Sequence, residues 1–422
     1  SCVSSSVSMR EPSTQHRISC SSHSSLPPSQ TFLSASTCDH HRPPPFIIPS
    51  YQEAIRLPSS YTLSKTVATS EDFSHPQLCT PVIKHIPKSV RTLCCAYLSK
   101  LLRQICTSPN DLSLWKLLIN FCSTFLSRPT RSGKKHSLSS IIRRRFNDSD
   151  DHNIDLSANS QNVSKHHKSN SLANMVSAKM EDGDVSAAIR LLCSDDKPIF
   201  DSAEVFEKLA ERHPLAAVDM QRQEDPALTT ALQVLDKEVS KAILSFPAGS
   251  SGGPDGLRPK HLIDLINCKT SGKDLLSAIT AFTNMLLEGK CHPAVRPILF
   301  GGNLIALAKK SGGIRPIAVG YTWRRIAAKC ANAFAMNTLG VYFAPIQLGV
   351  GVSGGCEAAV HATRRFIETM PADYVVAKLD FSNAFNNIRR DVMLKQVFDH
   401  VPDIYKFCCL SYEQPSILRY SS

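Results

Sequence analysis

Several common signatures are missing from this sequence. Its fifteen cysteines include no Cys-x-x-Cys spacing and stand singly or as the adjacent pairs Cys94-Cys95 and Cys408-Cys409. Many fall in apolar helical segments, where a reduced thiol behaves as a small hydrophobic side chain. The pattern argues against a disulfide framework and predicts no disulfide-linked partner. The closest approach to a metal cluster, Cys38-Asp39-His40-His41, lacks a second half at zinc spacing.

Targeting, membrane and P-loop signatures are also missing. The first thirty residues have no continuous apolar core of the kind found in a signal peptide. The longest stretch without charged residues, 330–356, is interrupted by Asn, Pro, Gln and several Gly, so it is a poor bilayer span. The glycine-rich loop 249–256 lacks the spacing and the Lys-Ser/Thr of a P-loop. We expect an intracellular protein, nuclear or cytoplasmic, with no membrane partner.

The size and charge of the chain limit the number of domains and the kind of partner that we expect. With 422 residues it is too long for one hydrophobic core, which predicts two or three domains. A formal net charge of +12 favours attraction to polyanions, and nucleic acid is the first candidate partner. A solvated basic surface explains the same charge equally well. The chain begins at Ser1 and ends in an apolar run that looks like an interrupted strand, so we expect a fragment at both ends.

Shifts in composition divide the chain into five parts. Residues 1–85 are rich in Ser and Pro, with little hydrophobic periodicity, and we expect them to be disordered. Helical periodicity in 86–146 predicts a helical hairpin followed by a basic connector, and the polar stretch 147–170 predicts a flexible linker. Residues 171–245 form a second helical region. In 246–422 the pattern changes between helical and strand periods.

Two basic features have more than one interpretation. The basic connector carries six cations that could contact phosphates or could belong to a solvated linker: Arg131, Lys134, Lys135, Arg143, Arg144 and Arg145. Residues 303–319 contain two apolar strands around a short Gly turn, which predicts a β-hairpin with Lys309 and Arg315 flanking its tip. An Arg fork beside a Lys point charge suits a triphosphate clamp, although solvated charges are also common at hairpin tips.

A strand predicted over 374–381 is buried along Val375, Val376 and Leu379 and ends in one acid, Asp380. A carboxylate placed where a sheet meets a cleft can hold a metal ion. An Asp at the end of a strand is also a common turn former or helix cap, and the residues alone leave both interpretations open.

Four motifs occur together in a particular order: Gly253-Pro254-Asp255-Gly256, Lys309 with Arg315-Pro316-Ile317, Gln347-x-Gly349, and Leu379-Asp380-Phe381-Ser382-Asn383-Ala384-Phe385. Their order resembles the N-terminal half of the reverse transcriptase domain of non-LTR (LINE-type) retrotransposons. The resemblance covers roughly 87–422 and is strongest from 245 onward. It implies an α+β fold with right-hand polymerase-like fingers and a partial palm in 246–422. It also implies RNA-directed DNA synthesis, with an RNA template, a DNA primer, dNTP and Mg²⁺.

The resemblance assigns roles to individual residues. Asp380 matches the first metal-binding carboxylate of the palm, and the backbone carbonyl of Phe381 is expected beside the second ion. Phe385 matches the bulky residue that excludes a ribose 2′-OH. Lys309 and Arg315 match residues of the fingers that grip the incoming triphosphate. Gln347 with Gly349 matches a turn near the template. A two-metal site would stabilise the attacking and leaving oxygens.

One departure from the family pattern concerns activity. The aromatic-x-Asp-Asp hairpin and the Gly-Gln-Gly-Asp-Pro loop before it are both missing, and the two Asp-Asp pairs, Asp150-Asp151 and Asp195-Asp196, lie far upstream. With one carboxylate, magnesium affinity should be weak or absent. We therefore expect a reverse transcriptase fragment that is inactive alone. The alternatives are a catalytically dead remnant that binds nucleic acid, or an untranslated relic of a decayed element.

Overall fold

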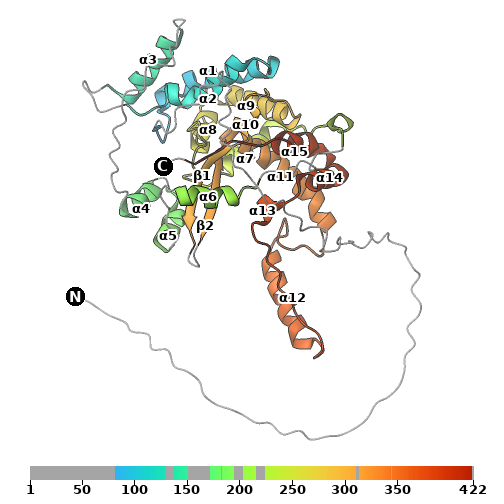
Figure 1. Cartoon of the computed structure of the whole chain (residues 1–422). Helices are drawn as coiled ribbons and strands as arrows, with labels where there is room; N and C mark the ends of the chain where they lie inside the picture. The colour runs from blue at the N-terminus through green and yellow to red at the C-terminus, as the bar shows by residue number, and fades with distance from the viewer. Residues whose placement is uncertain are drawn as a thin grey trace, which may run out of the picture. The chain divides into compact units, whose positions relative to one another are not determined.

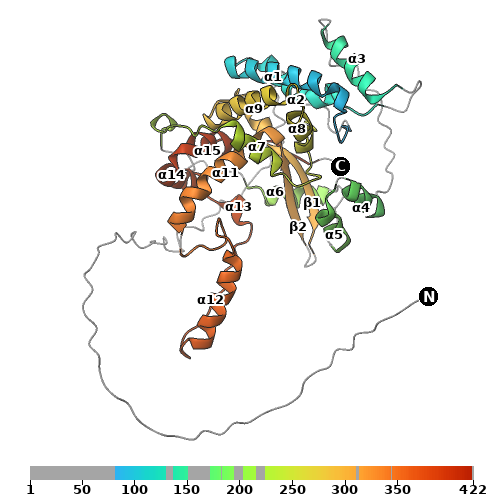
Figure 2. The ribbon, with the colours of Figure 1, turned by 180° about the vertical axis from the view of Figure 1, so that it is seen from behind.

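The computed structural model of the chain describes residues 81–129, 136–150, 172–181, 183–193, 203–214, 224–309, 313–343 and 345–420. All of them belong to the second of two units into which the chain divides, Ser70–Ser422. This unit is an α+β structure dominated by helices, and its described residues form one small sheet of three strands (Figure 1 and, from behind, Figure 2). The mixed fold class predicted from the sequence is confirmed at that level.

The first two helices form the predicted helical pair. After a short 3-10 turn, Lys88–Val90, come α1 (Arg91–Thr107) and α2 (Leu112–Phe125). Asp111 caps α2, because its side chain accepts a hydrogen bond of 2.9 Å from the backbone N–H of Ser113. Buried residues of α1 recur every three or four positions: Cys94, Leu98, Leu101, Leu102 and Ile105. This face packs along α9 (Gly272–Leu287).

The ends of two predicted segments differ in the structure. Residues 81–85, predicted as part of the disordered region, lie against the end of α2, where the Ile83 N–H donates to the Leu126 carbonyl at 3.0 Å. Helix α3 (Leu138–Asp150) continues four residues into the predicted linker, 147–170. The contact at Ile83 joins residues far apart in the sequence, so composition does not show it. Residues 1–80 and 151–170 lie outside the described residues.

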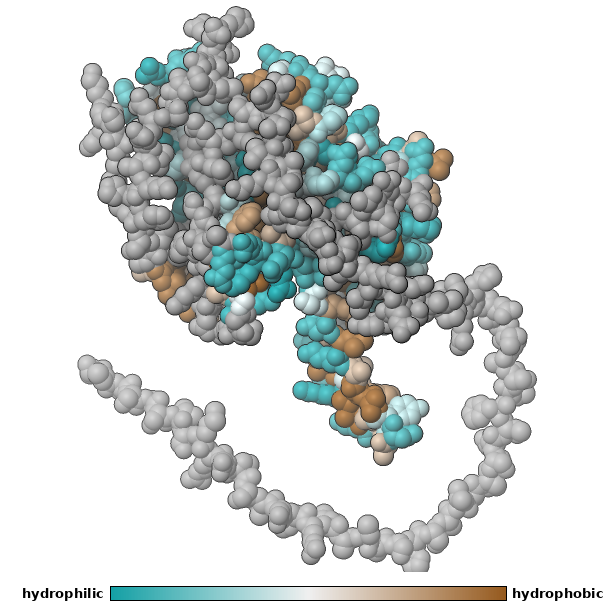
Figure 3. Space-filling model, viewed as in Figure 1, coloured by the Kyte–Doolittle hydropathy of each residue, from teal (hydrophilic) through white to brown (hydrophobic). Residues whose placement is uncertain are grey.

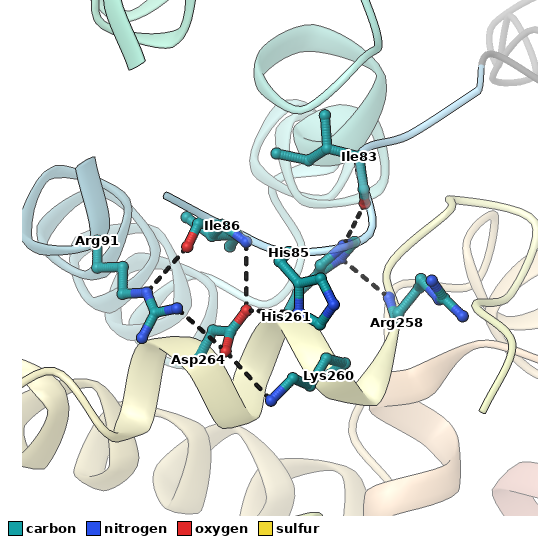
Figure 4. Close-up of polar contacts among 8 residues, drawn as sticks. All are labelled: Ile83, His85, Ile86, Arg91, Arg258, Lys260, His261 and Asp264. Carbon is teal, nitrogen blue, oxygen red and sulfur yellow. Dashed lines mark hydrogen bonds and ion pairs between the residues drawn. The ribbon is translucent and has the colours of Figure 1, made fainter. Parts of the chain in front are cut away.

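Helix α8 (Pro259–Ile266) ties the segment before α1 to the rest of the unit (Figure 4). The buried Asp264 carboxylate accepts a hydrogen bond of 3.2 Å from the Ile86 N–H. It also lies 3.1 Å from the Arg91 guanidinium and 3.4 Å from the Lys260 ammonium. A buried carboxylate is tolerated only when it is paired in this way.

His261, one turn before Asp264, makes a second buried connection (Figure 4). Its Nδ1 accepts a hydrogen bond from the Arg258 N–H at 3.2 Å, so Nε2–H donates to the Ile83 carbonyl at 2.8 Å. Burial lowers the pKa of His261 to about 4, and the ring is therefore neutral at pH 7. Through these bonds, and through a shared hydrophobic core, α1, α2 and α3 pack with α8 and α9.

The helical region 171–245 is more broken than its periodicity predicts. It contains α4 (Leu172–Glu181), α5 (Val185–Cys193), α6 (Ala203–Glu211) and α7 (Asp236–Leu244). Gly183, at φ +76°, separates α4 from α5. Within the predicted helical region, residues 226–244 form a 3-10 turn, Pro226–Leu228, an extended stretch and α7. The extended stretch is held by a segment far away in the sequence, because the Leu232 N–H donates to the Asp403 carbonyl at 2.8 Å.

The predicted hairpin is present and forms the centre of the sheet. Strand β1 (Gly302–Ala308) pairs antiparallel with β2 (Ile314–Gly320) and parallel with β3 (Leu418–Tyr420), giving the order β2-β1-β3. Helix α10 (Arg296–Leu299) leads into β1, and α11 (Thr322–Phe343) follows β2.

The remaining elements are α12 (Gly355–Thr369), α13 (Ala384–Asn387), α14 (Arg390–His400), a 3-10 turn at Pro402–Ile404 and α15 (Tyr405–Tyr412). Helix α12 makes no extended packing contact with any other described element. Figure 3 shows apolar atoms uncovered along it, and Val360, Phe366 and Ile367 are about half exposed.

The strand predicted over 374–381 is absent, and that prediction is wrong. These residues are extended but unpaired, with Val375 86% and Leu379 79% exposed. An extended segment becomes a buried strand only when neighbouring strands supply hydrogen bonds and a covering layer. The described sheet supplies neither here, because β1, β2 and β3 pair only with one another.

No helix within the described ranges combines the length and the apolar character needed to cross a lipid bilayer.

Candidate functional site

The β1–β2 hairpin has one covered face and one open face. Figure 1 shows α6 crossing the strands on one side, and Figure 2 shows the strands uncovered in front. Side chains on the open face include Ile305, 43% exposed, and Ile317, 38% exposed. The covered face forms a small hydrophobic cluster with α6: Leu304, Ala306 and Ile314 from the strands, and Val205 and Leu209 from the helix.

Lys309 and Arg315 lie on the open face near the turn. The register places Leu307 opposite Arg315, and the ladder continues when the Lys309 N–H donates to the Gly313 carbonyl at 3.1 Å. Because successive side chains alternate between faces, Leu307, Lys309 and Arg315 share one face. Lys309 and Arg315 occupy diagonal positions across the pair, close enough for both to contact one anionic group.

This arrangement can bind phosphate. An Arg guanidinium offers a planar fork of donors for two phosphate oxygens, and a Lys ammonium adds a point charge. The exposed aliphatic side chains beside them offer an apolar surface on which a sugar or a base can lie. The sequence predicted the two cations at the hairpin tip, and the register adds that they share the face opposite α6.

The two arginines that open α11 are turned toward the protein. Arg324 Nη1 donates to the Phe300 carbonyl at 3.2 Å, and burial lowers the pKa of its guanidinium. Arg325 Nη1 donates to the Ser251 carbonyl at 2.8 Å, and its guanidinium lies 4.7 Å from the centre of the Phe246 ring. Arg325 therefore holds the loop before α8 against α11, and Arg324 holds the end of α10 there.

The Gly253-Pro254-Asp255-Gly256 loop is packed beneath the start of α11. A Cβ added at Gly253 would lie 2.6 Å from the Cα of Tyr321, so only glycine allows this approach. Asp255 is buried, and its carboxylate accepts a hydrogen bond of 3.2 Å from the Leu257 N–H. Burial raises the pKa of Asp255 to about 7. The loop therefore acts as a packed connection between α8 and the end of the hairpin.

The Gln347–Gly349 motif forms a compact turn after α11. The Gln347 side-chain carbonyl accepts a hydrogen bond from the backbone N–H of Gly349. Such a side-chain-to-backbone bond fixes a turn without help from a regular element. The two residues predicted to lie near a template are thus held in a defined local shape, and Gly349 is exposed.

The segment that carries Asp380 is exposed. The side chain of Phe381 is 75% exposed and that of Phe385 is 96% exposed. Asp380 itself is exposed and makes no hydrogen bond or ion pair with any other described residue. The structure therefore shows the segment without the covering layer that a palm would provide.

Two asparagines of this segment anchor it to α6. The Asn383 and Asn386 side-chain amides donate to the Arg212 carbonyl, just past the end of α6, at 3.0 and 2.7 Å. Asn383 adopts φ +53°, a left-handed conformation that Asn tolerates better than most residues. Sequence reasoning missed this anchor, although the recurrence of Asn at 383, 386 and 387 is a usable turn signal.

The described side chains do not fit a two-magnesium site. Two bridged ions need at least two carboxylates, and Asp380 is a single exposed one. Among the residues that the structure describes, no group of three or more His, Cys, Asp or Glu side chains could hold a metal ion.

The three described arginines of the basic connector differ from one another. Arg145 Nη1 donates to the carbonyls of Phe125 and Ser127 at 3.0 and 2.8 Å, and burial lowers its pKa. Arg143 donates to the Ser89 carbonyl at 3.0 Å, while Arg144 is exposed beside Asp148 at 3.5 Å. Arg145 is thus occupied in joining α3 to α2. The other predicted cations of the connector, Arg131, Lys134 and Lys135, lie outside the described residues.

No protein-family model matches this chain, and no curated protein matches it.

Proposed function

We propose that the chain is a nucleic-acid-binding fragment of the reverse transcriptase type, which grips the phosphates of a template–primer through Lys309 and Arg315 and does not extend the primer alone. The observation that carries the proposal is the open face of the β1–β2 hairpin, where both cations lie beside exposed aliphatic side chains. The order of the four sequence motifs and the net charge of +12 support it.

The second part of the proposal, binding without catalysis, follows from Asp380. Its carboxylate stands alone and exposed, while two-metal phosphoryl transfer needs a second carboxylate source. Binding by cations has no such requirement, because each Lys or Arg that meets a phosphate releases counterions independently.

Binding can be tested with an RNA template annealed to a shorter, fluorescently labelled DNA primer. The affinity is measured by fluorescence anisotropy at a series of salt concentrations, for the full chain and for the K309A/R315A variant. If each cation contacts one phosphate, the slope of log K against log[salt] should become shallower by roughly 2 in the variant.

A matched control is R103A/K208A, which also removes one Arg and one Lys. Both cations are exposed and lie away from the open face of the hairpin. Arg103, on α1, pairs with Asp274, and Lys208, on α6, pairs with Glu204. The control should keep the wild-type slope. Equal losses in the two double variants would mean that net charge alone attracts the nucleic acid, and salt-insensitive binding would contradict the proposal entirely.

Primer extension tests the absence of catalysis. With dNTP and Mg²⁺ present, the full chain should add no nucleotide to the labelled primer. Template-dependent extension that disappears in the D380N variant would refute this part of the proposal.

A further inference from the structure

Two thiols from distant parts of the sequence meet where α1 packs against the turn between α8 and α9. Cys95 lies on the buried face of α1, and Cys268 lies in the turn and is partly exposed. The carbonyl of Leu265 accepts hydrogen bonds from both residues, from Cys95 Sγ at 3.5 Å and from the Cys268 backbone N–H at 2.9 Å. Two donors on one acceptor place the two residues side by side.

Further contacts of Cys268 reach the turn of α1 that carries Cys95. Thr92 Oγ1, one turn before Cys95 on α1, lies 3.5 Å from Cys268 Sγ, and Ser271 Oγ donates to the same sulfur at 3.5 Å. Cys94, the neighbour of Cys95, is also buried on α1.

Cys268 sits among hydroxyl groups, unlike the other described thiols. Thr92 Oγ1, Thr270 Oγ1 and Ser271 Oγ each lie 3.5 Å from its sulfur. Three hydroxyls around one sulfur stabilise the thiolate, and these hydrogen bonds lower the pKa of Cys268 to about 6. Arg91, which is paired with Asp264, acts electrostatically on Cys95, and Lys269, the sequence neighbour of Cys268, is exposed.

We propose that Cys268 is a peroxide-reactive thiol and that Cys95 is its resolving partner, so that oxidation links α1 to the α8–α9 turn by a disulfide. This modification site is independent of nucleic-acid binding. The Cys268 thiolate attacks one oxygen of hydrogen peroxide, a sulfur–oxygen bond forms, the oxygen–oxygen bond breaks, and the departing hydroxide takes up a proton to give water.

The second step closes the bond. The Cys95 sulfur attacks the sulfenic sulfur of Cys268, the Cys95 proton and the sulfenic oxygen leave together as water, and the disulfide forms. In total the two thiols lose two electrons and two protons, and one peroxide is reduced to two waters. Burial raises the pKa of the Cys95 thiol to about 11, so Cys95 is the weaker nucleophile and Cys268 reacts first.

The test treats the full chain with about one equivalent of hydrogen peroxide, blocks the remaining thiols and maps tryptic peptides by mass spectrometry without reduction. The expected product joins peptide 92–100 to peptide 261–269. The adjacent cysteine provides a matched control: C94S should keep the link and C95S should lose it. In C95S the sulfenic acid on Cys268 should persist and react with dimedone. Cys95 is buried, so C95S could lose the link by disturbing the fold. C268S changes a partly exposed position instead and should also lose the link.

The pH dependence of alkylation supplies a measurement that does not depend on cross-linking. The rate at Cys268 should be half-maximal near pH 6, because the rate follows the fraction of thiolate. A link through Cys94, or the absence of both the link and dimedone labelling at Cys268, would overturn the proposal.

Discussion

Replacing Asp255 by Asn should make the protein more stable at neutral pH and leave its stability unchanged in acid. The carboxylate is buried in the glycine-rich loop, and burial raises its pKa to about 7. In the unfolded chain the same group loses its proton near pH 3.8. Between these two values the folded state holds more protons than the unfolded state, so stability falls as the pH rises. Asn can accept the same hydrogen bond from Leu257 without a charge.

The size of the effect follows from the difference between the two pKa values. About three pKa units correspond to roughly 4 kcal/mol of unfolding free energy, which is an upper bound. The stabilising effect of D255N should be near zero at pH 4, grow between pH 4 and pH 7 and level off above pH 7. His261 contributes a slope of opposite sign between about pH 4 and 6.5, since its pKa is lowered by burial. The contribution of Asp255 is therefore obtained from the difference in unfolding free energy between D255N and wild type at each pH.

Urea unfolding followed by far-UV circular dichroism at several pH values from 4 to 8 gives this difference. D274N is a suitable control, because the pKa of the exposed Asp274 is lowered by its hydrogen bond with Arg103. Its carboxylate stabilises the fold above its pKa and not in acid, so D274N should be destabilising at pH 8 and neutral in acid, the opposite sign to D255N. If the effect of D255N did not change with pH, the reasoning about burial would be refuted.

Three further substitutions test the packing by urea unfolding. D264A should lower the free energy of unfolding by about 2–3 kcal/mol, because it leaves the Ile86 N–H without its acceptor and Arg91 without its carboxylate. The control D274A, which breaks an exposed ion pair, should lower it by under about 1 kcal/mol. Equal losses would contradict the buried connection. G253A should cost more than about 2 kcal/mol, because the new Cβ meets the Tyr321 backbone, while G340A, with open space inside α11, should stabilise by about 0.5–1 kcal/mol. L379K should change stability by less than about 0.5 kcal/mol, and a loss of 2 kcal/mol or more would restore the predicted buried strand.

Local patterns in the sequence were enough to predict most of the helices and the hairpin. The buried stripe of α1, the cap at Asp111 and the Gly turn between β1 and β2 depend on nearby residues, so their signals are visible in the sequence. The missing strand at 374–381 shows where this reasoning fails. Its β-branched apolar pattern fits a strand, but pairing requires partners from elsewhere in the chain.

At the candidate site, too, features set by nearby residues were predicted and contacts between distant residues were not. The sequence located Lys309 and Arg315 at the hairpin tip, and the register then placed them on the face opposite α6. It did not predict that Arg145 is occupied by the carbonyls at the end of α2, or that Asn383 and Asn386 anchor their segment to Arg212. These contacts join residues far apart in sequence, and a run of arginines looks the same whether it is free or bonded.

The salt dependence of template–primer binding tests the central claim most directly. For the full chain, the slope of log K against log[salt] should be steep, and it should become shallower by roughly 2 in K309A/R315A but stay unchanged in R103A/K208A. Identical slopes in both double variants, or binding that does not respond to salt, would contradict the claim that the open face of the hairpin binds phosphate.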